Sequence, residues 1–279
     1  QLLAEVLQCG KFAHPRQSSV DLDALALAGH IIRRQVGWPA QVHIHLHRFL
    51  QRLVPHLPDG VVEQLAVKLV AHRGDVARLL GAEDVSRAAD LKKQFPDTRV
   101  YQDWREMLDK EHKNLDSVNV STPDHMHAPM AMASMQRGLH VYGQKPLTHD
   151  VYESRRLAQF ATEKKLITQM GVQIHSHSAY KSAALLIQGG AIGKVQAVHT
   201  WSSKKWGDEG TLPDRQDPVP ESLNWDLWLG IAAKRPFLGD GYYHPGNWRR
   251  RLDFGTGTFG DMGCHIFDPV YNALGLTAP

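Results

Sequence analysis

Three short segments of this sequence hold the residue types that enzymes use for chemistry. Residues 121–127 read STPDHMH and follow the expected strand 115–120. Residues 143–146 read GQKP and follow the expected strand 139–142, and residues 257–265 read GTFGDMGCH. Hydroxyl groups, a lysine and a carboxylate–imidazole pair can contact a bound ligand, stabilise a developing negative charge and move a proton. These segments are therefore the first candidates for a site.

Each segment also has a structural explanation when it is taken alone. Asp124 is a good helix N-cap, and capping is the favoured interpretation of that segment by itself. An isolated Lys145-Pro146 is favoured as a surface lysine, and Asp261 with His265, four residues apart on one helix face, is more often a structural pair. Met126, Met130 and Met135 are expected in the core rather than in a site.

The elements that must position the first two segments alternate regularly between residues 82 and 171. Helices are expected over 84–94, 103–109, 124–137 and 151–164, and strands over 99–101, 115–120, 139–142 and 167–171. Strands that alternate with helices of this length form βαβ units and a parallel sheet. Ligands bind beyond the carboxyl ends of such strands, where residues 121–127 and 143–146 lie.

The pattern changes after residue 171. A helix over 178–188 and a strand over 195–201 are expected, followed by a Pro/Asp-rich loop at about 207–220. The fold class is therefore α/β: an incomplete Rossmann-type parallel sheet followed by an α+β domain with an open, mostly antiparallel sheet. The expected divisions are an atypical segment 1–81, a partial Rossmann domain 82–171, and a truncated substrate and oligomerisation domain 172–279.

The first 80 residues do not fit this scheme. Their apolar pattern suggests helices, for example over 61–76, and no run of buried parallel strands is evident. Their five glycines are too scattered for a Gly-x-Gly-x-x-Gly loop. That pattern does occur at Gly255, Gly257 and Gly260, but not in a first βα turn, so we interpret it as a coincidence. Because the chain begins at Gln1 and stops at Pro279, we expect a fragment.

Composition excludes several classes of function. The 279 residues carry a formal charge of +3, and the one basic cluster, Arg249-Arg250-Arg251, is expected to be solvated, so nucleic acid is not indicated. Cys9 and Cys264 cannot build a disulfide framework, which suits a cytoplasmic location, and no apolar run reaches the ~20 residues that span a membrane. Residues 43, 45 and 47 are alternating histidines without an acidic or cysteine ligand nearby, so we expect no metal site.

Together and in this order, the three segments resemble the glucose–fructose oxidoreductase/inositol 2-dehydrogenase family, Gfo/Idh/MocA. The resemblance rests on residues 118–152 (VNVSTPDHMHAPMAMASMQRGLHVYGQKPLTHDVY), 191–195 (AIGKV) and 253–268 (DFGTGTFGDMGCHIFD), and it covers roughly 84–279. Two features depart from the family. Gln144 replaces the usual glutamate before Lys-Pro, and the opening glycine loop is missing. The acidic residue expected after the second strand is unclear, with Glu83 and Asp84 as candidates.

The resemblance implies oxidation of a secondary alcohol on a sugar or cyclitol with NAD or NADP, or the reverse reduction. His265 would be the general acid/base, Lys145 would stabilise the substrate oxygen, and Asp261 would orient the histidine or hold another hydroxyl. The residues expected beside the nicotinamide are Ser121, Thr122, Pro123, His127, Gln144 and Lys145. The residues expected to contact the substrate are His175, His177 and Trp248. Further aromatic candidates for stacking on a sugar are Trp201, Trp206, Tyr242 and Tyr243. The family's second domain implies a homo-oligomer.

Two alternatives remain: NAD-dependent glycoside hydrolysis on the same fold, and a catalytically inactive binding or oligomerisation module. We further expect Lys145 and His265 to converge on one pocket. We expect weak or absent cofactor binding, because the missing glycine loop normally cradles the pyrophosphate. The sheet should then begin at about residue 98 without a normal first βαβ unit, and its strand edge should be uncovered or masked by irregular helices.

Overall fold

A computed structural model describes residues 68–71, 77–81, 84–94, 96–207 and 210–277. All of them fall within one structural unit, residues 63–279. The expectations for Cys9, for the three alternating histidines and for the scattered glycines of the first segment concern residues outside this described part of the chain.

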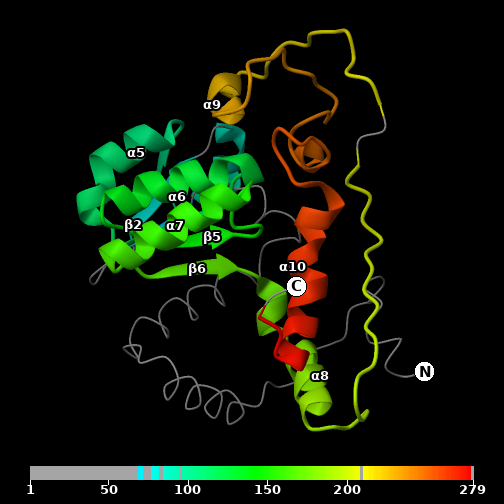
Figure 1. Cartoon of the computed structure of the whole chain (residues 1–279). Helices are drawn as coiled ribbons and strands as arrows, with labels where there is room; N and C mark the ends of the chain where they lie inside the picture. The colour runs from blue at the N-terminus through cyan, green and yellow to red at the C-terminus, as the bar shows by residue number, and fades with distance from the viewer. Residues whose placement is uncertain (1–67, 72–76, 82–83, 95, 208–209, 278–279) are drawn as a thin grey trace. The chain divides into compact units, whose positions relative to one another are not determined.

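A six-stranded sheet in the order β3-β2-β1-β4-β5-β6 forms the framework (Figure 1). The strands are β1 (Lys68–Ala71), β2 (Ala77–Gly81), β3 (Arg99–Tyr101), β4 (Ser117–Val120), β5 (His140–Gln144) and β6 (Thr168–Gly171). The neighbours β4, β5 and β6 are parallel, as are β2 and β3, whereas β1 is antiparallel to both β2 and β4.

The helices between 84 and 171 follow the predicted alternation closely. They are η3 (Val85–Arg87), α4 (Ala88–Gln94), α5 (Trp104–Glu111), η4 (His112–Asn114), η5 (Asp124–Met126), α6 (His127–Gln136) and α7 (Val151–Lys164). The start of α7 has a local cause: the Asp150 carboxylate accepts from the backbone N–H of Glu153, whose own side chain accepts from the backbone of Asp150. The predicted helices and strands of this region are thus confirmed, with ends shifted by a few residues.

The core of this region lies between the sheet and the helices α6 and α7. Helix α6 packs on β4, β5 and α7. Val118 and Val120 of β4 and Met130 and Met135 of α6 are at most 2% exposed. Met126 is also buried, so the prediction that these three methionines belong to the core is confirmed.

The prediction for the start of the sheet is wrong. Residues 68–71 form a strand, not part of a helix over 61–76, and the sheet begins there rather than near residue 98. Short apolar runs cannot be assigned by periodicity alone, and pairing with β4 and β2 satisfies the backbone of β1. The edge of β4 is therefore covered by a strand, with Lys68 opposite Asn119. The described β1 and β2 do not form a normal βαβ unit, because they are antiparallel and only five residues apart.

Residues 172–277 contain η6 (Gln173–Ser176), α8 (Ser178–Gln188), α9 (Trp225–Leu229), η7 (Asn247–Arg250) and α10 (Gly257–Leu274). The predicted helix 178–188 is confirmed, and α8 packs along α10. The predicted strand 195–201 is wrong: those residues pair with no strand of the described chain. A strand forms only where its backbone groups find partners, and residues 195–201 have none in the sheet of the described residues. The expected antiparallel sheet is therefore not formed among them.

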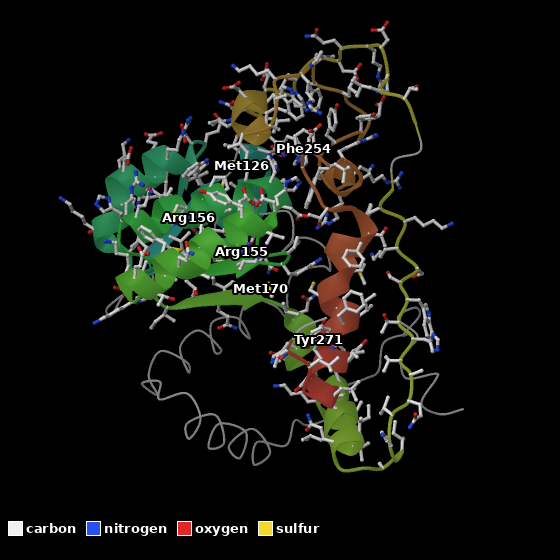
Figure 2. The ribbon with its side chains drawn as sticks, viewed as in Figure 1. Met126, Arg155, Arg156, Met170, Phe254 and Tyr271 are labelled. Carbon is white, nitrogen blue, oxygen red and sulfur yellow. The ribbon has the colours of Figure 1, made fainter. Side chains whose placement is uncertain are left out.

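Aromatic side chains build a second core before α10. Trp225 stacks on Trp228 with ring centroids 4.8 Å apart, and Trp228 lies 4.9 Å from Phe254. Phe254 is fully buried, and its carbonyl accepts from the backbone N–H of His125, 3.1 Å away, next to Met126 (Figure 2). This core therefore holds the chain leading into α10 against the loop after β4. No helix among the described residues is long and apolar enough to cross a membrane.

Candidate active site

Lys145 and Asp261 meet although 116 positions separate them. The Lys145 Nζ donates to the Asp261 Oδ1 at 2.6 Å and to the Asp261 carbonyl at 3.0 Å. Their side chains are 7% and 10% exposed. Lys145 follows directly after β5, at the carboxyl edge of the parallel strands, and Asp261 lies in the second turn of α10. The structure thus joins the second and third of the segments singled out in the sequence.

Asp261 has a second cationic neighbour that the sequence reasoning missed. The Arg249 Nε is 3.4 Å from the Asp261 Oδ1, and its guanidinium lies over the Trp248 ring at 4.3 Å from the centroid. Burial opposes ionisation of Asp261, but the hydrogen bond and charge of Lys145, together with the charge of Arg249, lower its pKa below the ordinary value. Asp261 is therefore held as a carboxylate between two cations.

The expectation of a solvated arginine cluster is wrong for two of its three members. Arg250 is exposed, but the Arg249 side chain is 13% exposed, and Arg251 lies over the Tyr242 ring at 4.1 Å. Aromatic rings of the same segment cover the two guanidinium groups, which hydrate more weakly than an ammonium. The available sequence signal was Trp248 directly before the arginines.

The glycines around Asp261 have structural causes. A Cβ on Gly255 would lie 2.7 Å from the Arg249 Cα, and one on Gly260 would lie 2.1 Å from the Thr256 Oγ1. Gly257 has a φ of +64°, at the first residue of α10. Close backbone approach and the helix start explain the Gly-x-Gly-x-x-Gly pattern here, and its interpretation as unrelated to a first βα turn is consistent with its place at the start of α10.

His265 lies one turn beyond Asp261 on α10 and is half-buried. Four residues along a helix advance about 6 Å and return to the same face. Lys145 therefore reaches the face of α10 that carries both predicted catalytic residues. Convergence of Lys145 and His265 themselves on one pocket stays a prediction.

The loop after β4 presents two buried hydroxyl residues at the carboxyl edge. The Ser121 Oγ donates to the Asn119 Oδ1 at 2.9 Å, whereas the buried Thr122 Oγ1 has no hydrogen-bond partner in the described part of the chain. Pro123 precedes η5, and the Gln144 Oε1 accepts from the Lys145 backbone N–H at 3.3 Å. The Thr122 hydroxyl is thus left without a protein partner among the described residues, while Ser121 and Gln144 have partners.

Asp124 does not cap a helix, so the capping interpretation is wrong. Pro123 occupies the N-cap position of η5, and the buried Asp124 Oδ2 instead accepts from the Thr256 hydroxyl at 2.9 Å. Burial raises the pKa of Asp124, against the opposing attraction of neighbouring cations.

A second contact joins the segment before α10 to the turn after β5: the His149 Nε2 lies 3.3 Å from the Gly255 carbonyl. The segment before α10 is therefore bound to the loops that follow both β4 and β5.

His127 is buried, and protein carbonyls engage both of its ring nitrogens. Its Nδ1 lies 2.6 Å from the Pro146 carbonyl and its Nε2 lies 2.7 Å from the Thr122 carbonyl. His127 thus lies between the two loops expected to contact the cofactor, with its polar atoms already engaged.

Each of the three predicted substrate residues has its own protein contact, and their role toward a substrate stays a prediction. His175 is exposed, and its Nδ1 lies 2.8 Å from the Asp268 carboxylate of α10. His177 packs on Tyr180 with ring centroids 5.7 Å apart. Trp248 is buried beneath Arg249, and its indole N–H donates to the Pro245 carbonyl. His175 nevertheless contacts α10 through Asp268, which lies about one turn beyond His265.

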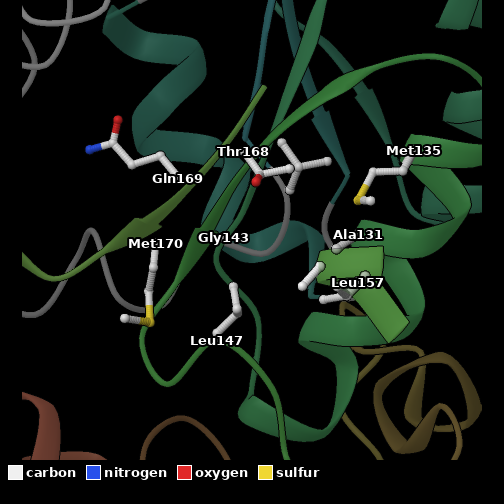
Figure 3. A pocket seen from close by; sticks show the side chains of 10 residues that line it. Ala131, Met135, Gly143, Leu147, Leu157, Thr168, Gln169 and Met170 are labelled. Carbon is white, nitrogen blue, oxygen red and sulfur yellow. The ribbon is translucent and has the colours of Figure 1, made fainter. Parts of the chain in front are cut away.

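An apolar cavity of ≈ 130 Å³ lies apart from these groups (Figure 3). It is lined by side chains of β5, β6, α6 and α7, including Met135, Leu157 and Met170. Because none of the candidate catalytic side chains lines it, we do not assign the site to this cavity. Among the described residues, no group of three His, Cys, Asp or Glu side chains is arranged to hold a metal.

Comparison with known proteins agrees with these motifs. Residues 62–172 match the Gfo/Idh/MocA family model described as an oxidoreductase family with an NAD-binding Rossmann fold, and residues 188–278 match its C-terminal alpha/beta domain. The Rossmann match therefore includes β1 and β2.

Curated relatives include a levoglucosan dehydrogenase of Pseudarthrobacter phenanthrenivorans, 22% identical over 72% of this chain and 43% of the relative. An NADP(+)-dependent scyllo-inositol 2-dehydrogenase of Bacillus subtilis is 26% identical over 68% of this chain and 43% of its own length. This chain thus spans less than half the length of these relatives.

A solved structure of myo-inositol 2-dehydrogenase from Lactobacillus plantarum is 27% identical, with a TM-score of 0.39 over 42% of this chain and 34% of that one.

The two family models together cover well over half of the sequence, with the Lys-Pro turn in the first match and the Asp261–His265 motif in the second. The chain belongs to the Gfo/Idh/MocA oxidoreductase family.

Proposed function

We propose that this chain carries the catalytic half of an NAD(P)-dependent oxidoreductase that acts on a secondary alcohol of a sugar or cyclitol. The observation that carries the proposal is the buried contact between Lys145 and Asp261 at the carboxyl edge of the sheet, with His265 one turn along the same helix. The names of the relatives, which are sugar and inositol dehydrogenases, support the substrate class.

The side chains have complementary roles in this reaction. Lys145 would donate a hydrogen bond to the reacting oxygen and stabilise its developing negative charge. His265 would accept the hydroxyl proton in oxidation and return it in reduction. Asp261 keeps the ammonium of Lys145 oriented, since its carboxylate and its carbonyl both accept from Nζ. A bound NAD(P) near the loop after β4 would supply the hydride acceptor for this oxidation.

The described residues fit such a cofactor in part. The buried, unpartnered hydroxyl of Thr122 lies in the loop after β4, where Rossmann domains bind their ligand. By contrast, five residues between antiparallel strands β1 and β2 leave no room for a crossover helix, whose N-terminus normally holds the pyrophosphate. We therefore propose that the nicotinamide end of the site is formed and that overall affinity for NAD(P) is weak.

Titration calorimetry with NADH and NADPH tests the cofactor proposal. We expect binding weaker than micromolar, and micromolar binding would show that residues outside the described part supply a phosphate site. Oxidation of a panel of polyols and sugars at saturating NAD or NADP tests the reaction. Turnover that is lost in Lys145→Met would support the assignment, whereas equal turnover in both proteins would remove Lys145 from the mechanism.

A second candidate function, a catalytically inactive binding module, is favoured by the antiparallel pairing of β1 and β2. The same measurements separate the two. A module would bind a polyol without turning it over at any cofactor concentration. Release of an aryl group from an aryl glycoside in the presence of NAD would instead indicate the glycoside-hydrolase chemistry of this fold.

A further inference from the structure

The ring of His127 is placed unusually for a buried histidine. It is the first residue of α6 and is 2% exposed. Its two nitrogens face two backbone carbonyls, Pro146 O at 2.6 Å and Thr122 O at 2.7 Å. One carbonyl belongs to the loop after β4 and the other to the turn after β5, directly beyond Lys145.

The chemistry of these contacts determines the proton count. A carbonyl oxygen only accepts, and a neutral imidazole carries one N–H, so it can satisfy one of two facing carbonyls. The other nitrogen would then present its lone pair to an oxygen less than 3 Å away. Turning the ring over would place carbon atoms there, but C–H···O contacts have C···O distances of about 3.3–3.6 Å. A proton on both nitrogens is the arrangement that satisfies both contacts.

His125, two residues earlier, provides a contrast within the same loop. It is also buried, at 1% exposed, but only its Nε2 meets a carbonyl, that of Leu229 at 3.1 Å. Its Nδ1 has no hydrogen-bond partner in the described structure. Burial lowers the pKa of His125 to about 4, so this ring is neutral at ordinary pH. The geometry therefore predicts a neutral His125 and a charged His127, two buried histidines of the same loop.

A buried imidazolium requires negative charge nearby. Asp124, three residues before His127, attracts it electrostatically, although burial opposes ionisation of that carboxyl. The other charged or titratable groups in this region are His125, Lys145, His149, Arg249 and Asp261. Asp124 and Asp261 are thus the two carboxylic acids named in this region, and Asp261 is already engaged by Lys145.

We propose that His127 is a positioning residue: as an imidazolium it ties the loop after β4 to the turn after β5 and thereby fixes where Lys145 stands. The catalytic consequence rests on the proposed oxidoreductase function, whereas the protonation of the ring does not. The residue would act through the backbone on both sides of the site without touching substrate.

Nitrogen-15 NMR of histidine-labelled protein tests the protonation directly. At about pH 7.5, where a free imidazole is mostly neutral because its pKa is about 6.5, we expect imidazolium shifts at both nitrogens of His127 and neutral shifts at His125. Spectra of His127→Gln and His125→Gln assign the two signals. A neutral His127 ring in the folded protein would overturn the inference, whatever the activity.

Kinetics test the positioning role. His127→Gln keeps a donor for one carbonyl, whereas His127→Leu keeps none. We therefore expect kcat to fall by on the order of 10-fold in the glutamine variant and 10²-fold in the leucine variant, with smaller changes in polyol KM. His112→Gln is the matched control, because His112 is a remote histidine whose Nδ1 meets the Leu108 carbonyl, and it should retain wild-type kcat.

Equal kcat values in wild type and both folded His127 variants would overturn the positioning role. If the wild type itself oxidises no polyol, the proposed function fails, and the NMR result still decides the state of His127. If the leucine variant does not fold, the kcat of the glutamine variant relative to wild type decides the positioning role, and the NMR spectrum decides the protonation of His127.

Discussion

The two halves of the sheet are built differently. Strands β4, β5 and β6 are parallel, are joined by α6 and α7, and cover a methionine-rich core. Strands β1 and β2 are antiparallel neighbours, and β1 is also antiparallel to β4. The first half presents Lys145 and the loop after β4 at one edge, as ligand-binding Rossmann sheets do. The second half lacks, among its described residues, the crossover helix that would hold a pyrophosphate. The proposed catalytic groups and the proposed cofactor-phosphate site thus depend on separate parts of one sheet.

The largest effect should come from the centre of the β4–β6 half. Lys145→Met should lower kcat by roughly 10²-fold to 10³-fold, the typical loss for one donor to a developing oxyanion. It should also destabilise the fold, because Asp261 would keep a buried charge after losing its closer cation. Steady-state kinetics and urea unfolding measure both effects. Lys110→Met, which removes an exposed lysine paired with Glu106, is the control; an equal loss in the two variants would contradict a special role for Lys145.

Packing of the same half should be almost as sensitive. Met130 is 1% exposed beneath the sheet, so Met130→Ala should lower the free energy of unfolding by about 2–5 kcal/mol. Met170 on the edge strand β6 is 41% exposed, so Met170→Ala should change the free energy of unfolding by less than about 0.5 kcal/mol. Urea titrations of both variants compare core with edge. Similar losses would show that the packed half has no distinct core at Met130.

The loop that joins the β4–β6 half to the aromatic core should make stability depend on pH. Because burial lowers the pKa of His125 to about 4, the unfolded chain takes up this proton first as pH falls. The contribution of His125 to stability should therefore be largest above about pH 6.5 and should decline towards pH 4, by about 3 kcal/mol. Thermal melts across this range should show a shallower decline for His125→Gln than for His112→Gln. Parallel declines in the two variants would assign the pH dependence to other groups.

The smallest expected effect concerns the local signal that begins α7. Asp150→Ala removes a capping box and should cost about 1 kcal/mol. Asp150→Asn keeps a side-chain acceptor for the Glu153 N–H and should cost clearly less. If urea unfolding shows the same loss for both, the hydrogen bond is not the cause.

Much of the β4–β6 half could be predicted from the sequence, because its signals are local. The alternation of strands and helices over 84–171, the stop of α6 near Gly138 and the start of α7 at Asp150 each depend on neighbouring residues. Each of the three segments quoted for the family is likewise continuous in sequence, and the two family models together cover them. Backbone propensity, capping and side-chain periodicity act over a few residues, so one sequence is enough to detect them.

Only the tertiary structure decided which distant groups meet. Residues 68–71 became a strand, and 195–201 did not, because strand formation depends on a partner for the backbone. Asp124, expected as a helix cap, instead accepts a hydrogen bond from Thr256. Arg249, expected in a solvated cluster, instead contacts Asp261 and the rings of two tryptophans. His127, expected beside the nicotinamide, was placed between two carbonyls. Hydrogen bonds and burial of charge join groups that are close in space, and their energies depend on neighbours that no local pattern specifies.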